Sequence, residues 1–361
     1  MKVKIGDLTK IKTGKLDANA SSEDGQYPFF TCSREPLKIS TYSYDCECVL
    51  VAGNGDLNVK YYNGKFDAYQ RTYIIEDNGS GKLYMPYLYY FMEGYIEELR
   101  KQAIGGVIKY IKLGNLTEAL IELPSVDEQK SIVEILEKAK GILDKRSDEI
   151  CALDDLIKAR FVERFGDPKS NSFGFDKMML KDTCKVVTGN TPSRSVAEYY
   201  GDYIEWIKTD NIVPGLFNPT KATESLSKKG MEIGRIVDRN SILMACIAGS
   251  IASIGRVCIT DRMVAFNQQI NAIIPKRYNI LFLYVLLQVS KDYLVEEINM
   301  ALKGILSKSK LEKKEFIVPP MEMQNQFAEF VEQINKSKVS IQKALDETKL
   351  LFDSLMQKYF G

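Results

Sequence analysis

Two stretches of the chain place apolar residues at the spacing of a long amphipathic helix. In residues 125–166 the apolar positions follow one another at alternating steps of three and four, and residues 320–361 show the same pattern. Pro124 and Pro320 stand where a helix start tolerates proline, and Gly166 and Gly361 where a helix ends. Each stretch is therefore predicted to form one helix of about 40 residues, roughly 60 Å long at about 1.5 Å per residue.

Helices of this length need a partner for their apolar stripe, and each predicted helix is the natural partner of the other. A whole lobe separates them in the sequence, so the chain has to leave and return, which favours an antiparallel pair. The alternative is that each helix packs only on its own lobe, although a stripe this long exceeds what a compact lobe usually covers. The positions predicted to line the helix pair are Ile132, Ile135, Ala139, Ile142, Leu153, Leu156, Phe327, Phe330, Ile334, Ile341, Leu351 and Leu355.

The chain contains an internal repeat. Residues 123–129 (LPSVDEQ) align with residues 318–324 (VPPMEMQ), and the same offset of 195 residues carries the end of the first helix onto the end of the second. Thr13-Gly14 aligns with Thr188-Gly189 at an offset of 175, and residues 68–71 (AYQR) align with residues 265–268 (AFNQ) at an offset of 197. Three matches in the same order indicate a duplication in which the lobes diverged by insertion.

Outside the helices the pattern changes to short apolar runs bounded by Gly, Asn or Asp, which predict strands. These runs are residues 48–52, 72–75, 242–247, 255–259 and 270–274, whereas residues 84–100 and 281–289 predict short helices. The predicted fold class is α+β, with two mixed α/β lobes joined by two long helices in an antiparallel coiled coil, related by a pseudo-two-fold repeat. The predicted domains are a first lobe (1–124), a first helix (125–166), a second lobe (167–319) and a second helix (320–361).

Composition narrows the classes of function. A chain of 361 residues with 45% apolar content can bury more than one core. It has no histidine, the commonest general base and metal ligand, and its seven cysteines are scattered without a C-x-x-C pair. We therefore expect reduced thiols rather than a zinc site or a disulfide framework. No leader-like or membrane-length apolar run occurs, so we expect a soluble cytoplasmic protein without a membrane partner.

A net charge of +1 argues against a simple DNA-coating protein but permits segregated charges. Catalytic motifs are missing as well. Residues 53–55 (GNG) follow an apolar strand, but the next residues predict a hairpin rather than the helix that a phosphate-cradling turn needs. Asn218-Pro219-Thr220 fails the pattern of an adenine methyltransferase, and no P-loop motif occurs. We expect no catalytic residue, metal site or cofactor in this chain.

Candidate DNA contacts are side chains whose donors and acceptors match base edges or phosphates. Gln70-Arg71 and Asn267-Gln268-Gln269 occupy equivalent places in the two lobes, directly before a predicted strand. The alternative for these amides is that they satisfy buried backbone groups, and for the charged candidates that they are only solvated surface groups. The remaining candidates lie in predicted loops and in a lysine cluster before the second helix: Lys60, Lys109, Thr191, Ser193, Arg194, Lys208, Asn211, Arg256, Lys303, Lys308 and Lys310.

Several strings together resemble the hallmarks of specificity subunits of type I restriction-modification systems. In the second half these are residues 188–193 (TGNTPS), 205–210 (EWIKTD), 253–255 (SIG), 266–269 (FNQQ) and 318–320 (VPP) with Gln324. The first half is similar in outline, with Thr13-Gly14, the hairpin-like stretch 53–65 and residues 123–129. It lacks a tryptophan and the Thr-Pro pair.

The resemblance implies a non-catalytic DNA-binding subunit in which each lobe is a target recognition domain for one half of a split, asymmetric site. It implies that the long helices set the distance between the half-sites and dock two modification subunits. Those subunits would carry S-adenosylmethionine and methylate adenine, and restriction subunits would add ATP- and magnesium-dependent chemistry. The implied partners are therefore double-stranded DNA, modification subunits and restriction subunits.

Two other readings of the sequence stay open. The chain could be a fragment of a fused restriction or methyltransferase enzyme, which would show catalytic motifs in the rest of the polypeptide. It could also be a structural coiled-coil adaptor without DNA affinity, which explains the helices but not two large divergent lobes.

Overall fold

The computed structural model describes residues 2–296, 298 and 304–361. The chain divides into unit 1 (Met1–Arg146 with Ala344–Gly361) and unit 2 (Ser147–Lys343). Two 40-residue helices, α4 (Val126–Phe165) and α10 (Met321–Phe360), contribute residues to both units. Each begins one residue after, and ends one residue before, the range that the sequence predicted.

Unit 1 is built on a six-stranded sheet. Its elements are β1 (Lys2–Lys4), α1 (Ile5–Leu8), β2 (Thr9–Thr13), η1 (Ala18–Ala20), β3 (Tyr27–Phe30), β4 (Leu37–Ile39), β5 (Tyr44–Ala52), β6 (Val59–Ala68), β7 (Thr72–Asp77), α2 (Met85–Gln102), α3 (Leu113–Thr117) and β8 (Leu120–Glu122). The strand order is β2-β7-β5-β6-β3-β4, and β1 pairs separately with β8. β5 and β6 form the antiparallel hairpin that the sequence predicted around residues 53–65.

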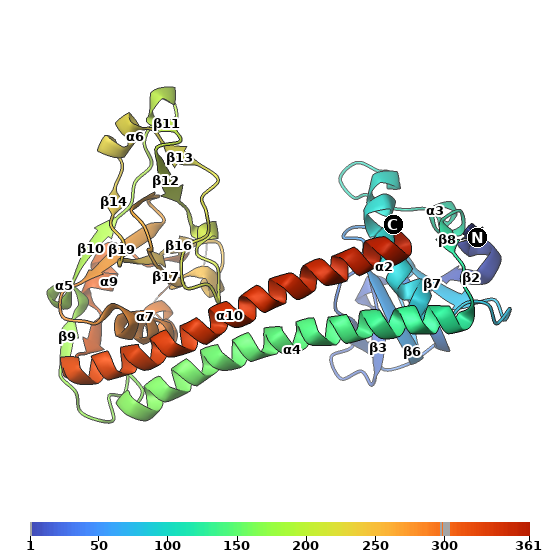
Figure 1. Ribbon diagram of the computed structural model, residues 1–361, viewed down its shortest axis with the longest axis horizontal. Helices are drawn as coiled ribbons and strands as arrows, with labels where there is room; N and C mark the ends of the chain where they lie inside the picture. Colours follow the sequence, from blue (N-terminus) through green and yellow to red (C-terminus); the bar gives the residue numbers. More distant parts are fainter. Residues whose placement is uncertain (1, 297, 299–303) are drawn as a thin grey trace. The chain divides into compact units, whose positions relative to one another are not determined.

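Alternation along β5 explains how this sheet is covered on both faces. Val49 and Val51 face a core that includes Leu88 and Met92 of α2, whereas Cys48 and Leu50 face a second core formed with Phe30 and Phe66. Figure 1 shows α2 beside the strands of unit 1.

Unit 2 contains a four-stranded sheet, β10-β19-β15-β17, and a five-stranded sheet, β11-β13-β12-β18-β14, and β16 pairs separately with β20 and β9 with β21. Its elements are β9 (Lys177–Met179), α5 (Leu180–Thr183), β10 (Cys184–Thr188), η2 (Ala197–Tyr199), β11 (Tyr200–Gly201), β12 (Ile204–Ile207), η3 (Thr209–Asn211), β13 (Ser225–Leu226), α6 (Lys228–Ile233), β14 (Ile236–Val237), β15 (Ile242–Ala245), β16 (Ile247–Ala248), η4 (Ile251–Ser253), β17 (Val257–Ile259), β18 (Val264–Phe266), β19 (Ile270–Pro275), α7 (Ile280–Val289), α8 (Lys291–Val295), β20 (Gly304–Ile305), α9 (Lys308–Lys313) and β21 (Glu315–Ile317).

The two long helices run antiparallel in each unit. In unit 1 the guanidinium of Arg146 in α4 donates to the Ala344 carbonyl and the Thr348 hydroxyl in α10. In unit 2 the ring of Phe161 near the end of α4 lies 5.5 Å from that of Phe327 near the start of α10. The beginning of one helix therefore lies beside the end of the other, which confirms the predicted antiparallel pair (Figure 1).

The helix seam is shifted from part of the predicted stripe. Ala139 and Phe327 are buried, and Ile132, Leu153, Phe330, Ile334, Ile341 and Leu355 are half-buried. Four predicted seam residues, Ile135, Ile142, Leu156 and Leu351, are instead exposed. Leu136 and Ile157, which directly follow Ile135 and Leu156, are buried instead, because the helices turn the adjacent row of side chains inward.

A buried glutamine joins each long helix to its lobe. Gln129 accepts from the Tyr84 amide at 2.8 Å and donates to the Pro124 carbonyl at 3.0 Å, and Gln324 accepts from the Asn279 amide at 2.9 Å and donates to the Pro319 carbonyl at 2.8 Å. Both side chains are at most 1% exposed. The repeated proline and glutamine of the sequence therefore form the same hydrogen-bonded junction twice, as expected for buried polar groups.

Candidate nucleic-acid interface

One turn in each unit carries the strongest predicted DNA contacts. In unit 1 it connects β6 to β7, and in unit 2 it connects β18 to β19. The Tyr69 amide donates to the Phe30 carbonyl at 2.9 Å, and the Asn267 amide donates to the Ile207 carbonyl at 3.0 Å. Tyr69 and Asn267 each also accept from the residue three positions later, Thr72 at 2.8 Å and Ile270 at 3.1 Å.

These hydrogen bonds correct the predicted alignment of the two turns. They place Tyr69 opposite Asn267, an offset of 198 rather than the 197 inferred from letter identity. Gln70 therefore corresponds to Gln268, and Arg71 corresponds to Gln269. The prediction that Arg71 and Gln268 are equivalent positions was wrong, because matching Ala68 to Ala265 ignored which residue starts each turn.

The two equivalent glutamines are exposed, and each side chain forms one hydrogen bond within its lobe. The Gln70 side-chain amide donates to Asp17 at 3.1 Å, whereas the Thr191 hydroxyl donates to the Gln268 side-chain carbonyl. Each amide keeps donor and acceptor capacity for an outside group, as adenine recognition requires. Arg71 is exposed and Gln269 half-buried.

A glycine beside each turn explains the repeated Thr-Gly pair. A Cβ on Gly14 would lie 2.2 Å from the Ala68 carbonyl oxygen, and a Cβ on Gly189 would lie 2.1 Å from the Asn267 carbonyl oxygen. Both approaches are closer than atoms can come, so any side chain would push the turn away. Glycine is therefore needed for the strand end to reach the turn.

Two predicted amides serve the lobe itself. Asn211 accepts from the Lys208 amide at 3.0 Å and donates to Thr220 and Lys221, and it is 6% exposed. Asn267, also 6% exposed, accepts from the Gln269 amide at 3.1 Å and donates to the Gln269 side chain. For Asn267 this is the structural alternative that the sequence left open, and for Asn211 the same role was not anticipated.

An aromatic platform with two cations lies beside the turn of unit 2. The Arg194 guanidinium lies 4.6 Å from the centre of the Tyr200 ring and 5.3 Å from that of Trp206, and the Lys208 ammonium lies 5.2 Å from the Trp206 ring. Glu224 pairs with Arg194 at 2.7 Å and also with Lys208. The Lys208 contact, followed by that of Arg194, keeps the pKa of Glu224 below its ordinary value despite partial burial.

The segment between the turn and this platform is tied to both. The Trp206 indole donates to the Asn190 carbonyl at 3.2 Å, and the Tyr200 hydroxyl donates to the Pro192 carbonyl at 2.6 Å. Thr191, which lies between Asn190 and Pro192, donates its hydroxyl hydrogen bond to Gln268. Ser193 is exposed and shares a hydrogen bond with Ser195 at 2.7 Å. The structure thus brings together Thr191, Ser193, Arg194, Lys208 and Gln268.

The other predicted lysines are scattered. Lys60 is half-buried and donates to Asn58, and burial lowers its pKa. Lys109 is exposed, Lys308 pairs with Glu312 at 3.6 Å, and Lys310 is exposed in α9. Lys303 lies outside the described residues.

Arg256 has a cationic neighbour that the sequence did not reveal. The Lys291 ammonium donates to the Ala252 carbonyl at 2.6 Å, and the Arg256 guanidinium donates to the same oxygen at 3.3 Å. Neither forms an ion pair with a carboxylate in the part of the chain that the structure describes. Burial and the nearby Arg256 charge lower the pKa of Lys291. Both cations line a cavity of about 250 Å³ together with Lys158 and Asp154. Arg256 and Lys291 lie far apart in the sequence, which is why their proximity was not predicted.

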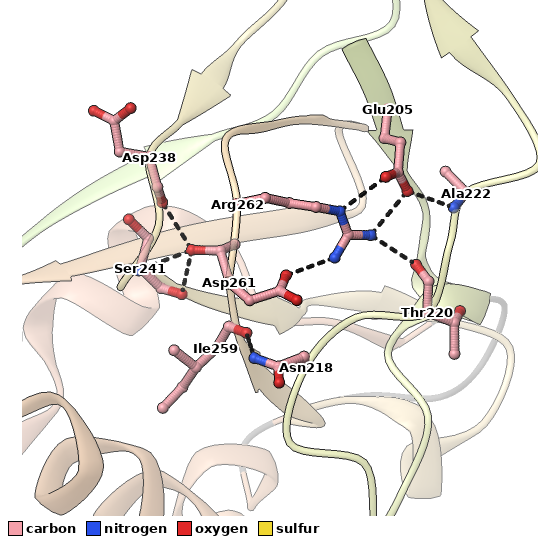
Figure 2. A network of polar contacts seen from close by, with 10 residues as sticks. Glu205, Asn218, Thr220, Ala222, Asp238, Ser241, Ile259, Asp261 and Arg262 are labelled. Atoms are coloured by element: carbon pink, nitrogen blue, oxygen red, sulfur yellow. Dashed lines mark hydrogen bonds and ion pairs between the residues drawn. The ribbon is translucent and has the colours of Figure 1, made fainter.

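An ion pair holds the connection between β17 and β18 (Figure 2). The Arg262 guanidinium donates to both carboxylate oxygens of Glu205, each at 2.8 Å, and Glu205 also accepts from the Ala222 amide at 2.8 Å. The Arg262 contact keeps the pKa of Glu205 below its ordinary value. The Thr260 hydroxyl donates to the Asp238 carbonyl at 2.7 Å. The Asn218 side chain donates to the Ile259 carbonyl at 2.7 Å, as Figure 2 shows. Glu205 precedes Trp206, so the network also fixes the platform strand.

The sequence matches the family described as the type I restriction modification DNA specificity domain over residues 1–150 and 174–348. The chain belongs to this family. The family resemblance seen in the sequence is thereby confirmed, and the two matched regions correspond to the two halves of the internal repeat.

Specificity subunits of three type I restriction enzymes are similar to this chain in sequence, each over a different fraction of its length. The EcoDI specificity subunit of Escherichia coli is 44% identical over 135 residues, 37% of this chain and 30% of that subunit. The HindI specificity subunit of Haemophilus influenzae is 35% identical over 107 residues, 28% of this chain and 22% of that subunit. The MjaIX specificity subunit of Methanocaldococcus jannaschii is 25% identical over 301 residues, 75% of this chain and 67% of that subunit. The matched part of this chain thus spans less than a third of the first two relatives.

Solved structures show the same fold. The S subunit of a type I restriction-modification system from M. genitalium superposes with a TM-score of 0.61 at 16% identity, covering 100% of this chain and 96% of that one. A chain from a study of complex assembly and conformational transition of the type I R-M system gives 0.56 at 15% identity, covering 100% and 97%. The predicted α+β architecture of two lobes and paired helices is confirmed.

In the described residues, no helix has the length and apolar content needed to cross a membrane.

Proposed function

We propose that this chain is the sequence-specific DNA-binding subunit of a type I restriction-modification assembly, with one lobe for each half of a bipartite, asymmetric site. The observation that carries the proposal is the pair of equivalent turns. Both present an exposed glutamine at the same backbone position, beside a glycine that only close packing explains. The surroundings of the two glutamines differ in charge and aromatic content, as reading two different half-sites requires.

Phosphate contacts in the second lobe are assigned to Arg194, Lys208 and the pair of Arg256 and Lys291. Their cationic groups approach carbonyl oxygens, aromatic rings or one shared carboxylate rather than separate acids. Cations placed in this way are available to exchange onto a DNA backbone. Lys109 and Arg71 are the exposed candidates of the first lobe.

The partners in this proposal are two modification subunits, docked along the helix pair, and restriction subunits. S-adenosylmethionine, ATP and magnesium belong to those partners, and the assembly acts on DNA in the cytoplasm. Four apolar residues of the predicted seam are exposed on the helix pair. They support docking of a partner subunit there, because without a partner these side chains would remain in water.

The test is methylation mapping in cells that express the chain with its modification subunits. A bipartite adenine-methylated motif that disappears when the chain is deleted is expected. A motif that persists without the chain would overturn the proposal. The fused-enzyme alternative makes a separate claim, namely that the isolated chain binds S-adenosylmethionine. Calorimetry on the purified chain should show no such binding.

A further inference from the structure

One carboxylate of unit 2 neutralises two cations at once. Glu224 contacts the ammonium of Lys208 with one oxygen and lies 2.7 Å from the Arg194 guanidinium with the other. Its position is fixed by the backbone, because the Trp206 amide donates to the Glu224 carbonyl at 3.1 Å. Both cations also lie over the Trp206 ring. Arg194 and Lys208 therefore each contact both the Glu224 carboxylate and the Trp206 ring.

This arrangement is not needed to hold the platform together. Trp206 is 3% exposed and is fastened by its own hydrogen bond to Asn190. The ion pairs are partly exposed, with 56% of the Arg194 side chain and 34% of the Glu224 side chain accessible. Partly exposed pairs of this kind contribute little to stability, because water and salt screen them. Stabilisation of the fold therefore does not explain why Arg194 and Lys208 both pair with Glu224.

Both cations lie close in the chain to residues that contact the turn carrying Gln268. Lys208 follows Ile207, whose carbonyl accepts from the Asn267 amide. Arg194 follows Thr191 by three residues, and Thr191 holds Gln268 of the proposed recognition turn. In the proposed binding mode, a duplex whose bases reach Gln268 would carry its phosphates past this part of the lobe. Carboxylates and phosphates offer these cations the same kind of charged acceptor oxygens.

We propose that Glu224 occupies, in the free protein, the place that a DNA backbone phosphate takes in the seated complex, and so withholds Arg194 and Lys208 from DNA that does not fit. This inference rests on the proposed DNA-binding function. In a loosely bound, nonspecific complex the carboxylate keeps both cations. When base contacts at the turn seat the duplex, a phosphate replaces the carboxylate. Glu224 is thus a specificity-determining residue that acts by lowering nonspecific affinity.

The inference predicts a change in the salt dependence of binding. Each phosphate contact adds about 0.9 to the slope of log affinity against log salt. For Glu224→Gln, we expect the slope with a 40-base-pair duplex of arbitrary sequence to steepen by about 1 to 2, with roughly tenfold higher affinity near 0.1 M salt. The slope with a target duplex, selected from a random library by the wild-type chain, should not change, because the seated complex already has these contacts.

Glu198→Gln is the matched control. It removes the same charge from the same lobe, but Glu198 pairs with Lys229, which has no proposed DNA contact. Thermal unfolding of each variant verifies that unit 2 is intact. Equal effects of Glu198→Gln and Glu224→Gln on arbitrary DNA would overturn the proposal, because only net charge would then matter.

A second variant keeps the inference testable if Glu224→Gln does not fold. Arg194→Gln in the otherwise wild-type chain should reduce the slope with the target duplex by about 0.9 and leave the slope with the arbitrary duplex unchanged. An equal reduction on both duplexes would mean that Arg194 is free before DNA binds, which contradicts the proposal. A wild-type chain that selects no target would instead refute the DNA-reading function itself, so the two failures are distinguishable.

Discussion

The two units build the same turn on the same backbone but surround it with different chemistry. In unit 1, β6 is one continuous strand, and Gly64 within it adopts a φ of +137°. In unit 2 the corresponding stretch is divided into β17 and β18, and the position of Gly64 is taken by Arg262, which pairs with Glu205. At the same distance along the chain from the turn, unit 1 thus has a glycine with positive φ inside a continuous strand. Unit 2 has a break between two strands that is held by a polar network.

Charge is distributed differently as well. In unit 1, residues 53–58 connect β5 to β6, and Asp56 in this loop neutralises Arg34 at 3.0 Å and Arg100 at 3.1 Å. In unit 2 the corresponding loop, residues 246–256, is longer and ends with Arg256 beside Lys291, without an acid between them. A shared scaffold with unshared surface charge indicates that the duplication preserved positioning and changed recognition.

The largest expected effect concerns the close glycines. Gly14→Ala and Gly189→Ala should each destabilise their own unit by about 3 kcal/mol or more, since the added Cβ has backbone oxygens within van der Waals distance. Chemical unfolding combined with hydrogen exchange of residues 68–72 and 266–270 measures this. Gly249→Ala, whose Cβ would have no neighbour within 4 Å, is the control. Tolerance at one glycine but not at the other would break the equivalence of the turns.

The two equivalent glutamines are expected to affect different half-sites. Gln70→Ala and Gln268→Ala should each weaken the binding free energy for the correct base in one half-site by about 1 to 3 kcal/mol. The base preference at the other half-site should stay unchanged. Selection from a random duplex library, with enrichment scored separately for the two half-sites, measures this. If both variants relax the same half-site, the assignment of one lobe to each half-site is wrong.

The unneutralised cations of unit 2 should give a smaller effect. Replacing both Arg256 and Lys291 with Gln removes up to two phosphate contacts, so the salt slope should fall by about 1 to 2 and affinity near 0.1 M salt should fall roughly tenfold on any sequence. Arg34→Gln in unit 1 is the comparison, because Asp56 already neutralises Arg34. An unchanged slope for the Arg256 and Lys291 variant would mean that these cations do not face DNA.

The sequence predicted the repeating parts of this molecule better than the parts that differ. The long helices and their antiparallel pairing follow from a periodicity repeated over many turns, and the Pro and Gln of each junction were visible as a repeat. The register of the turns was missed by one residue, because hydrogen bonds to β3 and β12 define it and these strands have unrelated sequences. Lys291 and Glu224 were missed since each acts on a residue far away in sequence. Long-range pairing of single charges leaves no periodic signal.

The smallest predicted effect tests whether the polar network of unit 2 replaces the glycine of unit 1. Glu205 has a lowered pKa because Arg262 and the Ala222 amide stabilise its charged form. A carboxylate whose folded pKa is depressed contributes stability above its unfolded pKa, about 4.3, and loses that contribution as the pH falls through the lower folded value. Glu205→Gln should therefore lower the free energy of unfolding of unit 2 by about 1 kcal/mol at pH 7.

The same variant should come closer to the wild type in stability as the pH is lowered below about 4.3, because the wild-type carboxyl is then also neutral. Denaturant unfolding at a series of pH values, with hydrogen exchange of residues 259–264 to locate the change, distinguishes this from a general effect of charge. Glu198→Gln removes a charge from an exposed pair and should leave the midpoint unchanged at every pH. A stability difference between wild type and Glu205→Gln that is independent of pH would show that the ion pair with Arg262 is not what holds β17 and β18 in place, and that shape alone maintains the break in the strand.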